Sequence, residues 1–359
     1  MRVVALAMSV VSLIFVGVMP ARAEERQDGR PSATTANVRD FGATGDGQRD
    51  DTRAFREAIS ALDAGGVLYV PQGRYVVSDR LVIAKSISVR GTGVGSQIFQ
   101  NGQSTLLLLQ GVNAVTISHL YLGSRATAPG ASLIQLNNSH HNRIVDVTML
   151  GGDTGLYLHG SLLNTIQDLR TGVNFGGFFG AVSANKNWVV ADAFNNISSN
   201  QNTFIAPVLE GGVNGFVISD NNGQGSVTIS GGTVEGVSGV AMSFNNTFLP
   251  SVVSGFHFEA NGVADVVLNS SSNIRLSSII SLKNVLLKGD TRNVEVADSI
   301  VEHMTIDATT KRIRLQNITS CLQGPGGLVN NNTGVSPYDG SPNVVISQAG
   351  PAGSYCMGL

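Results

Sequence analysis

The sequence predicts an all-β parallel solenoid that is covered at its N-terminal end by one short helix. Two observations lead to this prediction. The period of an amphipathic helix occurs only near the N-terminus, and short β-rich pieces then recur at a spacing of 20 to 25 residues. A repeat of this length indicates coils that stack on one another, so that each coil buries its apolar side chains against the next.

The first residues predict export. Met1 and Arg2 precede an apolar run over residues 3–20, and Ala21-Arg22-Ala23 follows as a cleavage site. The run is close in length to a short membrane span, which leaves an anchor as the alternative. The polar residues after Ala23 favour a cleaved signal peptide over residues 1–23. We therefore expect a secreted or periplasmic protein without a membrane contact after cleavage.

The remaining chain divides into a short linker and one domain. Residues 24–36 are polar and precede any periodic pattern, and residues 37–359 form one β-helix domain with a C-terminal cap. Charged residues make up 13% of the chain and the net charge is -2. With this charge and no basic run, the sequence gives no basis for binding nucleic acid.

The predicted helix covers Thr52–Leu62 and has Asp50 or Asp51 as its N-cap. Gly65 and Gly66 end it, and residues 67–70 are expected to form a buried strand. The helix would cover the first coil of the solenoid, because one side of it is apolar. The apolar stripe consists of Phe55, Ala58, Ile59 and Leu62.

The repeats lie between about residue 81 and residue 346. A strand pattern that starts at Asn142 recurs at Asn164, and three later strands of one kind each end in a glutamate. The regular leucine frame of a leucine-rich repeat is absent, and a sandwich would show hairpin turns but no fixed spacing along the chain. A parallel β solenoid is therefore the predicted architecture. The glutamates are Glu210, Glu235 and Glu259.

Two segments carry a family resemblance. Residues 38–52 contain Gly-Ala-Thr-Gly-Asp-Gly, and residues 65–75 contain Val-Pro-Gln-Gly-Arg-Tyr. In this order they resemble the opening of the pectate-lyase superfamily, the group allied to the family 28 glycoside hydrolases and the phage tailspikes. The resemblance implies a single-stranded right-handed parallel β-helix and a polysaccharide ligand, and it leaves a homotrimer open. It supplies no reaction, because one fold hosts many activities.

The catalytic motifs of the pectin-cleaving hydrolases do not carry over. Their Asn-Thr-Asp, Gly-His-Gly and Arg-Ile-Lys motifs are absent, and Asp50-Asp51 lies in the opening segment. A calcium-dependent lyase needs several aspartates on the outer face of one sheet, and we expect no carboxylate there. The sequence therefore predicts no metal and no cofactor. The expected outward positions are Gln135, Asn137, Tyr157, His159, Val217, Ser219, Ala241, Ser243, Val267 and Asn269.

Glu210, Glu235 and Glu259 are the first catalytic candidates. If they stack, their like charges raise one another's affinity for protons. A protonated acid beside an ionised base is the pair that glycoside cleavage requires. The alternative is a solvated ladder at a repeated turn. Asp146 and Asp168 also recur in register, and we interpret them as structural residues of a tight turn.

His159 is the second catalytic candidate, with Tyr157 beside it on the outer face. Residues 171–200 lengthen one coil and are expected to form an inserted loop that contains Lys186 and Trp188. Tyr157 and Trp188 would pack on sugar rings, and His159 or Lys186 would abstract a proton next to a uronate carboxylate that Arg170 holds. The alternative is a partly buried aromatic plug over the coil.

Cys321 and Cys356 are expected to form one disulfide that ties down the C-terminal tail, with two unpaired thiols as the alternative. The sequence as a whole predicts an exported carbohydrate-active protein that cleaves a polysaccharide as a glycoside hydrolase or a lyase. Two other functions stay open. One is a β-helix that binds glycans without catalysis, and the other is a factor in the biosynthesis or epimerisation of a cell-surface polysaccharide.

Overall fold

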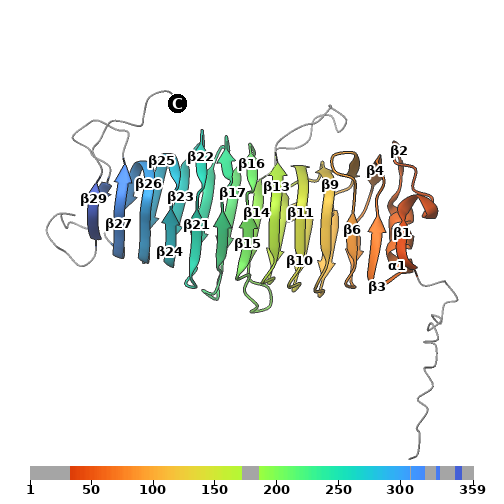
Figure 1. Cartoon of the computed structure of the whole chain (residues 1–359), viewed down its shortest axis with the longest axis horizontal. Coiled ribbons are helices and arrows are strands. Elements are labelled where there is room, and N and C mark those ends of the chain that lie inside the picture. Colours follow the sequence, from red (N-terminus) through yellow and green to blue (C-terminus); the bar gives the residue numbers. More distant parts are fainter. Residues whose placement is uncertain (1–32, 172–185, 308, 320–328, 332–343, 350–359) are drawn as a thin grey trace, which may run out of the picture. The chain divides into compact units, whose positions relative to one another are not determined.

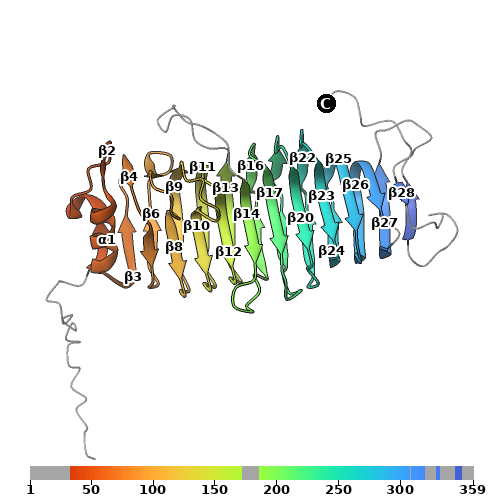
Figure 2. The same cartoon turned by 180° about the vertical axis from the view of Figure 1, so that it is seen from behind.

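The computed structural model describes residues 33–171, 186–307, 309–319, 329–331 and 344–349. The chain winds into a right-handed parallel β-helix, in which consecutive coils lie side by side from the orange to the blue end of the ribbon (Figures 1 and 2). Strands one coil apart pair in parallel and in register. The predicted solenoid is therefore confirmed.

A coil presents three faces. β12 (Thr154–His159) lies on face 1, and β13 (Thr165–Thr171) then starts on face 2, bends at Asp168 and ends on face 3. Asp168 has a φ of 52°, a left-handed conformation that produces the bend. The other coils repeat this path.

Most strands belong to one face each. Face 1 contains β5 (Leu81–Ile83), β8 (Leu107–Gln110), β10 (Ser132–Asn137), β12, β14 (Asn187–Asp192), β17 (Asn214–Ser219), β20 (Val240–Asn245), β23 (Ala264–Asn269) and β28 (Val329–Asn331). Face 2 contains β1 (Ala33–Asn37), β3 (Leu62–Tyr69), β6 (Ser88–Arg90), β15 (Asn202–Ile205), β18 (Val227–Ser230), β21 (Ser251–Ser254) and β24 (Ser272–Ser277). Face 3 contains β2 (Asp46–Asp50), β4 (Gly73–Val77), β7 (Ser96–Gln100), β16 (Val208–Glu210), β19 (Thr233–Glu235) and β22 (His257–Glu259).

The remaining strands turn a corner between faces, as β13 does. They are β9 (Thr116–Ser124), β11 (Arg143–Gly151), β25 (Ile280–Lys288), β26 (Arg292–Ile306), β27 (Lys311–Thr319) and β29 (Val344–Ala349). Because the strands alternate inward and outward side chains, every coil adds to one continuous apolar core. On face 2, for example, one row of that core consists of Ile117, Ile144, Ile166, Phe204 and Ile229, all at most 1% exposed.

A ladder of buried asparagines joins three coils at the start of face 2. The backbone N–H of Asn142 donates to Oδ1 of Asn164 at 2.9 Å, and that of Asn164 donates to Oδ1 of Asn202 at 3.1 Å. Each side-chain amide also donates to a carbonyl oxygen of an earlier coil, as Asn164 Nδ2 does to the oxygen of Ser139 at 3.2 Å. The asparagine that marked the repeat in the sequence is thus a buried link between coils.

The N-terminal helix α1 (Thr52–Ala61) buries Phe55, Ala58 and Ile59, so the predicted apolar stripe is confirmed. The predicted end is wrong, because β3 begins at Leu62 and runs through Gly65 and Gly66. The helix thereby passes directly into a strand of the first coils.

The two aspartates before α1 have different partners. Asp50 accepts hydrogen bonds from the backbone and hydroxyl of Thr52. Asp51 occupies the N-cap position, but its carboxylate accepts from the backbone N–H groups of Thr44 and Gly45. It thus fastens the preceding Gly-rich segment instead of the helix.

Three predictions concern the ends of the chain. Residues 33–36, which the sequence placed in the linker, belong to strand β1. The expected signal peptide and both Cys321 and Cys356 lie outside the described residues. In the part of the chain that is described, no helix is long and apolar enough to cross a bilayer.

Replacing Asn164 by Ala should destabilise the protein. The change removes the acceptor for Asn142 and leaves buried polar groups without partners, at a cost on the order of 3 kcal/mol. Guanidinium unfolding should show this loss relative to the wild type. Asn221→Ala, at an exposed turn position, is the matched control and should change the free energy of unfolding little. Equal stabilities of the two variants would contradict a structural role for the ladder.

Candidate active site on face 1

Tyr157 and His159 lie on the outer side of face 1. Their neighbours Leu156 and Leu158 point inward and are fully buried, and the alternation of β12 places the two polar side chains outside. The next coil contributes β14, whose last residue Asp192 is in register with His159. An outward carboxylate therefore lies beside the histidine, one coil along the solenoid.

Asp192 joins the two outward side chains of β12. Tyr157 Oη donates to Asp192 Oδ2 at 2.7 Å, and His159 Nδ1 lies 2.6 Å from Asp192 Oδ1. The side chains of His159 and Asp192 are only 21% and 29% exposed, so water screens this contact weakly. One carboxylate thus orients both a phenol and an imidazole.

The imidazole of His159 contacts two aromatic rings. Its centroid lies 4.9 Å from that of Tyr157 and 4.5 Å from that of Phe194. Because a carboxylate only accepts, the Nδ1 that faces Asp192 carries a proton, and in the neutral imidazole Nε2 then has the free lone pair. His159 is therefore oriented as a base that acts through Nε2.

Tyr157 acts as a hydrogen-bond donor to Asp192. Burial, and then the hydrogen bond and the charge of Asp192, raise the pKa of the Tyr157 phenol far above its ordinary value. The phenol consequently keeps its proton at neutral pH and serves as a hydrogen-bond donor. Of the two side chains, only His159 can accept a proton there.

The structure corrects the prediction for Trp188. The coil between Asn164 and Asn202 is 38 residues long, as predicted, but its second half returns to face 1 as β14. Trp188 lies in that strand, is 3% exposed, and donates from Nε1 to the carbonyl oxygen of Gly211 at 2.8 Å. A side chain buried so deeply cannot pack on a sugar at the surface.

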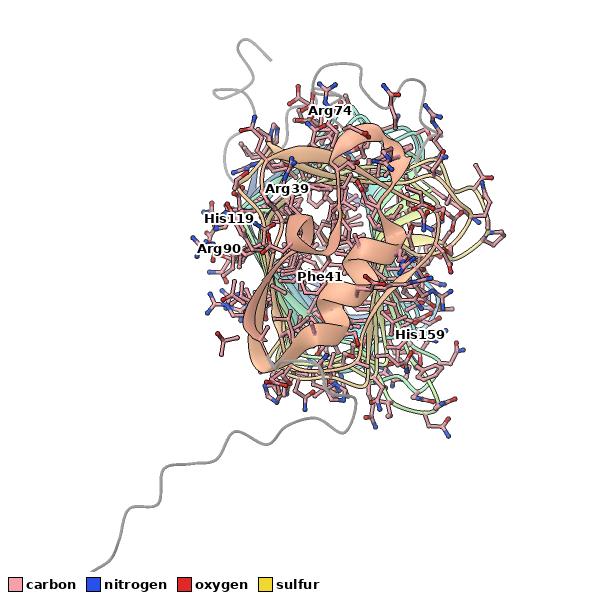
Figure 3. The ribbon with its side chains drawn as sticks, turned by 90° about the vertical axis from the view of Figure 1, so that its right-hand side faces the viewer. Arg39, Phe41, Arg74, Arg90, His119 and His159 are labelled. Carbon is pink, nitrogen blue, oxygen red and sulfur yellow. The ribbon has the colours of Figure 1, made fainter. Side chains whose placement is uncertain are left out.

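Lys186 and Arg170 have different positions. Lys186 is exposed and directly precedes β14, and its role as a base stays a prediction. Arg170 lies on face 3 and pairs with Asp146 at 2.8 Å. Asp146 also bonds His119, which lies on the opposite side of the coil from His159 (Figure 3). The expectation that Arg170 holds a substrate carboxylate beside His159 is therefore wrong.

Sequence reasoning missed Asp192. The statement that the outer positions of face 1 carry no carboxylate is wrong, because residues 187–192 had been assigned to a loop. Their alternation matches that of the neighbouring strands β12 and β17, and this was the signal that could have identified them. Ala241 was also placed wrongly, since it is buried.

The three glutamates stack as predicted. Glu210 pairs with Glu235, and Glu235 pairs with Glu259, each at the end of its strand on face 3. His257 lies near the last of them, with Nε2 3.9 Å from Glu259 Oε2. The catalytic role of the column stays a prediction. Within the described ranges, no three His, Cys, Asp or Glu side chains are grouped so that they could hold a metal ion.

Replacing Tyr157 by Phe should change how stability depends on pH. In the unfolded chain a tyrosine titrates near pH ~10, whereas the folded protein holds the Tyr157 proton to higher pH. The wild type should therefore lose stability as pH rises above about 10, because the unfolded state releases a proton that the folded state keeps. Urea unfolding at a series of pH values should show a smaller loss in Tyr157→Phe. Parallel curves for the two proteins would contradict this.

Known proteins resemble the chain in sequence and in fold. Alginate lyase 7 from Azotobacter vinelandii is 40% identical over 73 residues, which is 18% of this chain and 8% of that enzyme. The chain thus matches less than a tenth of the length of this relative.

Two solved structures share the fold. The A-module of the mannuronan C-5 epimerase AlgE6 from Azotobacter vinelandii has a TM-score of 0.53 at 17% identity, over 87% of this chain and 98% of the module. A mutant of DFA-IIIase from Arthrobacter chlorophenolicus A6 in complex with DFA-III has a TM-score of 0.58 at 14% identity, over 89% and 86%.

A family model matches a longer part of the chain. The model describes the rhamnogalacturonase A/epimerase, pectate lyase-like proteins, and it covers residues 35–222. The match begins within β1 and includes all strands from β2 to β17, and therefore Tyr157, His159 and Asp192. With more than half of its residues matched, the chain belongs to the rhamnogalacturonase A/epimerase, pectate lyase-like family.

Proposed function

We propose that this chain is an exported enzyme that modifies an acidic polysaccharide, and that His159 removes the proton next to a uronate carboxylate. The contact of Asp192 with both His159 and Tyr157 carries this proposal. Family membership makes the protein a carbohydrate-active β-helix related to lyases, epimerases and glycoside hydrolases. The export signal that residues 1–23 predict is part of the proposal.

The reaction needs a base that is held in place. When Nε2 of His159 takes the proton from the carbon beside the carboxylate, the imidazole becomes a cation, and the adjacent Asp192 stabilises it. The electron pair left on that carbon is delocalised into the carboxylate. Expulsion from the next carbon of the glycosidic oxygen, which takes up a proton from water, then gives the lyase product. Delivery of a proton from water to the opposite face of the first carbon gives the epimer.

Tyr157 and Phe194 keep the base in position. The phenol holds Asp192 by a hydrogen bond and stays protonated, because its pKa is raised. The ring of Phe194 also contacts the imidazole, with its centroid 4.5 Å away. The names of an alginate lyase and a mannuronan epimerase among the similar proteins support uronate chemistry over other reactions of the family.

Asp192→Asn and His159→Gln should each lower turnover of an acidic polysaccharide by about 10²- to 10⁴-fold. Alginate and polygalacturonate are the substrates to use. Ultraviolet absorbance measures the unsaturated uronate of elimination, and deuterium uptake from heavy water, read by NMR, measures epimerisation. Glu235→Gln removes a carboxylate from face 3 and should retain wild-type turnover. Wild-type rates in both site variants would refute the proposed base.

A second function is favoured by the glutamate column. Strands in a sheet lie about 4.7–4.9 Å apart, and the two carboxyl groups of a retaining glycosidase lie about 5–5.5 Å apart. The register of Glu210, Glu235 and Glu259 supports a comparable spacing. Glycoside hydrolysis at this corner is therefore the alternative activity.

For hydrolysis, Glu235→Gln should abolish the release of new reducing ends from a neutral polysaccharide, because Glu235 is the central member of the column. A reducing-sugar assay on a panel of neutral glucans and fructans measures this. Asp192→Asn serves as the control and should retain the activity. If Glu235→Gln still released reducing ends, the glutamate column would be excluded as the catalytic site of hydrolysis. Binding of the polysaccharide without any product would favour the non-catalytic glycan-binding alternative.

A further inference from the structure

A hollow lies in the first coils, at the corner between faces 2 and 3. It has a volume of about 640 Å³, a size typical of ligand sites. Arg90 and His119 lie next to each other on this side of the β-helix, and His159 lies on the other side (Figure 3). The hollow is therefore separate from the face-1 site. Its lining includes Tyr69, Arg90, Gly91, Gly93, His119 and Asp146.

The charges of the hollow leave an excess of positive groups. Oδ2 of Asp146 lies 2.9 Å from Nδ1 of His119, and Oδ1 of Asp146 accepts a hydrogen bond from Nη1 of Arg170 at 2.8 Å. The hydrogen bond with His119, and then that with Arg170, lower the pKa of the Asp146 carboxyl, so it is ionised and already engaged. Arg90 is exposed, and its guanidinium makes no hydrogen bond or ion pair with the described residues. Its guanidinium is available to an anion from outside.

The corner itself does not require a histidine. His119 and Asp146 have φ values of 55° and 51°, and the same position in later coils is equally left-handed. Small residues meet this requirement there without any long side chain, as at Ala206, Gly231, Gly255 and Ser278. The backbone conformation therefore does not explain why a histidine occupies position 119. Because Nδ1 of His119 contacts Asp146, its Nε2 remains for a ligand.

The floor of the hollow is fixed. Gly93 donates its N–H to the carbonyl oxygen of His119 at 2.8 Å, and Gly91 donates to that of Ser118 at 2.9 Å. A Cβ on Gly91 would lie 2.2 Å from the oxygen of His119, so only glycine allows this approach. Beside this floor, Tyr69 pairs in register with Arg90 and is half-buried. An aromatic ring and a free guanidinium thus stand side by side on a rigid base.

We propose that this hollow is a second saccharide-binding site, which takes a sugar that carries a carboxylate. Arg90 would bind the carboxylate through two parallel hydrogen bonds, Tyr69 would pack on the C–H face of the ring, and His119 Nε2 would meet a hydroxyl. The site binds and does not react. It holds a polysaccharide independently of the chemistry on face 1.

Histidine side chains report on the two sites separately. In ¹H–¹³C NMR spectra of the full chain labelled at its six histidines, His119→Gln and His159→Gln assign the two signals. Titration with tetramannuronate or tetragalacturonate should shift the His119 signal in a saturable way. Arg90→Gln should weaken this response by about 10-fold or more. Arg143→Gln removes the same charge from an exposed position on face 2 outside the hollow, and should leave the affinity unchanged.

Several outcomes would overturn the proposal. They are no shift of His119 with either oligouronate, equal binding of neutral mannotetraose, an equal response to acetate at the same concentration, or wild-type affinity in Arg90→Gln. The signal of His159 tests the face-1 site in the same spectra. A shift at His119 alone would therefore support the second site even if the proposed function of face 1 failed.

Discussion

The in-register stacking of coils is the constraint on which the rest of this structure depends. A side chain gains its neighbours from positions 19 to 38 residues away, because each coil bonds the next along three faces. The asparagine ladder makes this register costly to change, since a shifted coil would leave buried amides of Asn142, Asn164 and Asn202 without partners. Hydrogen bonds between buried polar groups therefore fix the register of the coils as much as apolar packing does.

The face-1 site follows from this constraint. Asp192 meets His159 only because the 38-residue coil returns to face 1 without a slip, and a slip of one residue would turn the carboxylate inward. Both side chains stand on strands and not on loops, so their separation is fixed before a ligand binds. Such preorganisation is what a base needs when it must meet a poorly acidic C–H group.

The sequence was informative where the pattern is local or repeats at a regular spacing. The stripe of α1, the recurrence of Asn142 and Asn164, and the glutamate column were all predicted correctly, because each reflects one coil in contact with its neighbour. The insertion before β14 broke the spacing, which concealed the strand that contains Trp188 and Asp192. Arg170 was misplaced for another reason. A tight turn at Asp168 was predicted, but the sequence did not show that the left-handed bend there sends the residues after it onto a different face.

The described coils contain two histidine–aspartate contacts between neighbouring coils, and their surroundings give them different chemistry. His159 is 21% exposed and is packed against aromatic rings. Its partner Asp192 is shared with the neutral phenol of Tyr157. At the other corner His119 is 42% exposed, and Asp146 is shared with the guanidinium of Arg170. A carboxylate that already faces a permanent cation stabilises an imidazolium less, because much of its charge is neutralised. The same pair of residue types therefore suits proton transfer on face 1 and ligand binding at the corner. The difference arises from the deeper burial of His159 and from the additional contact of Asp146 with Arg170.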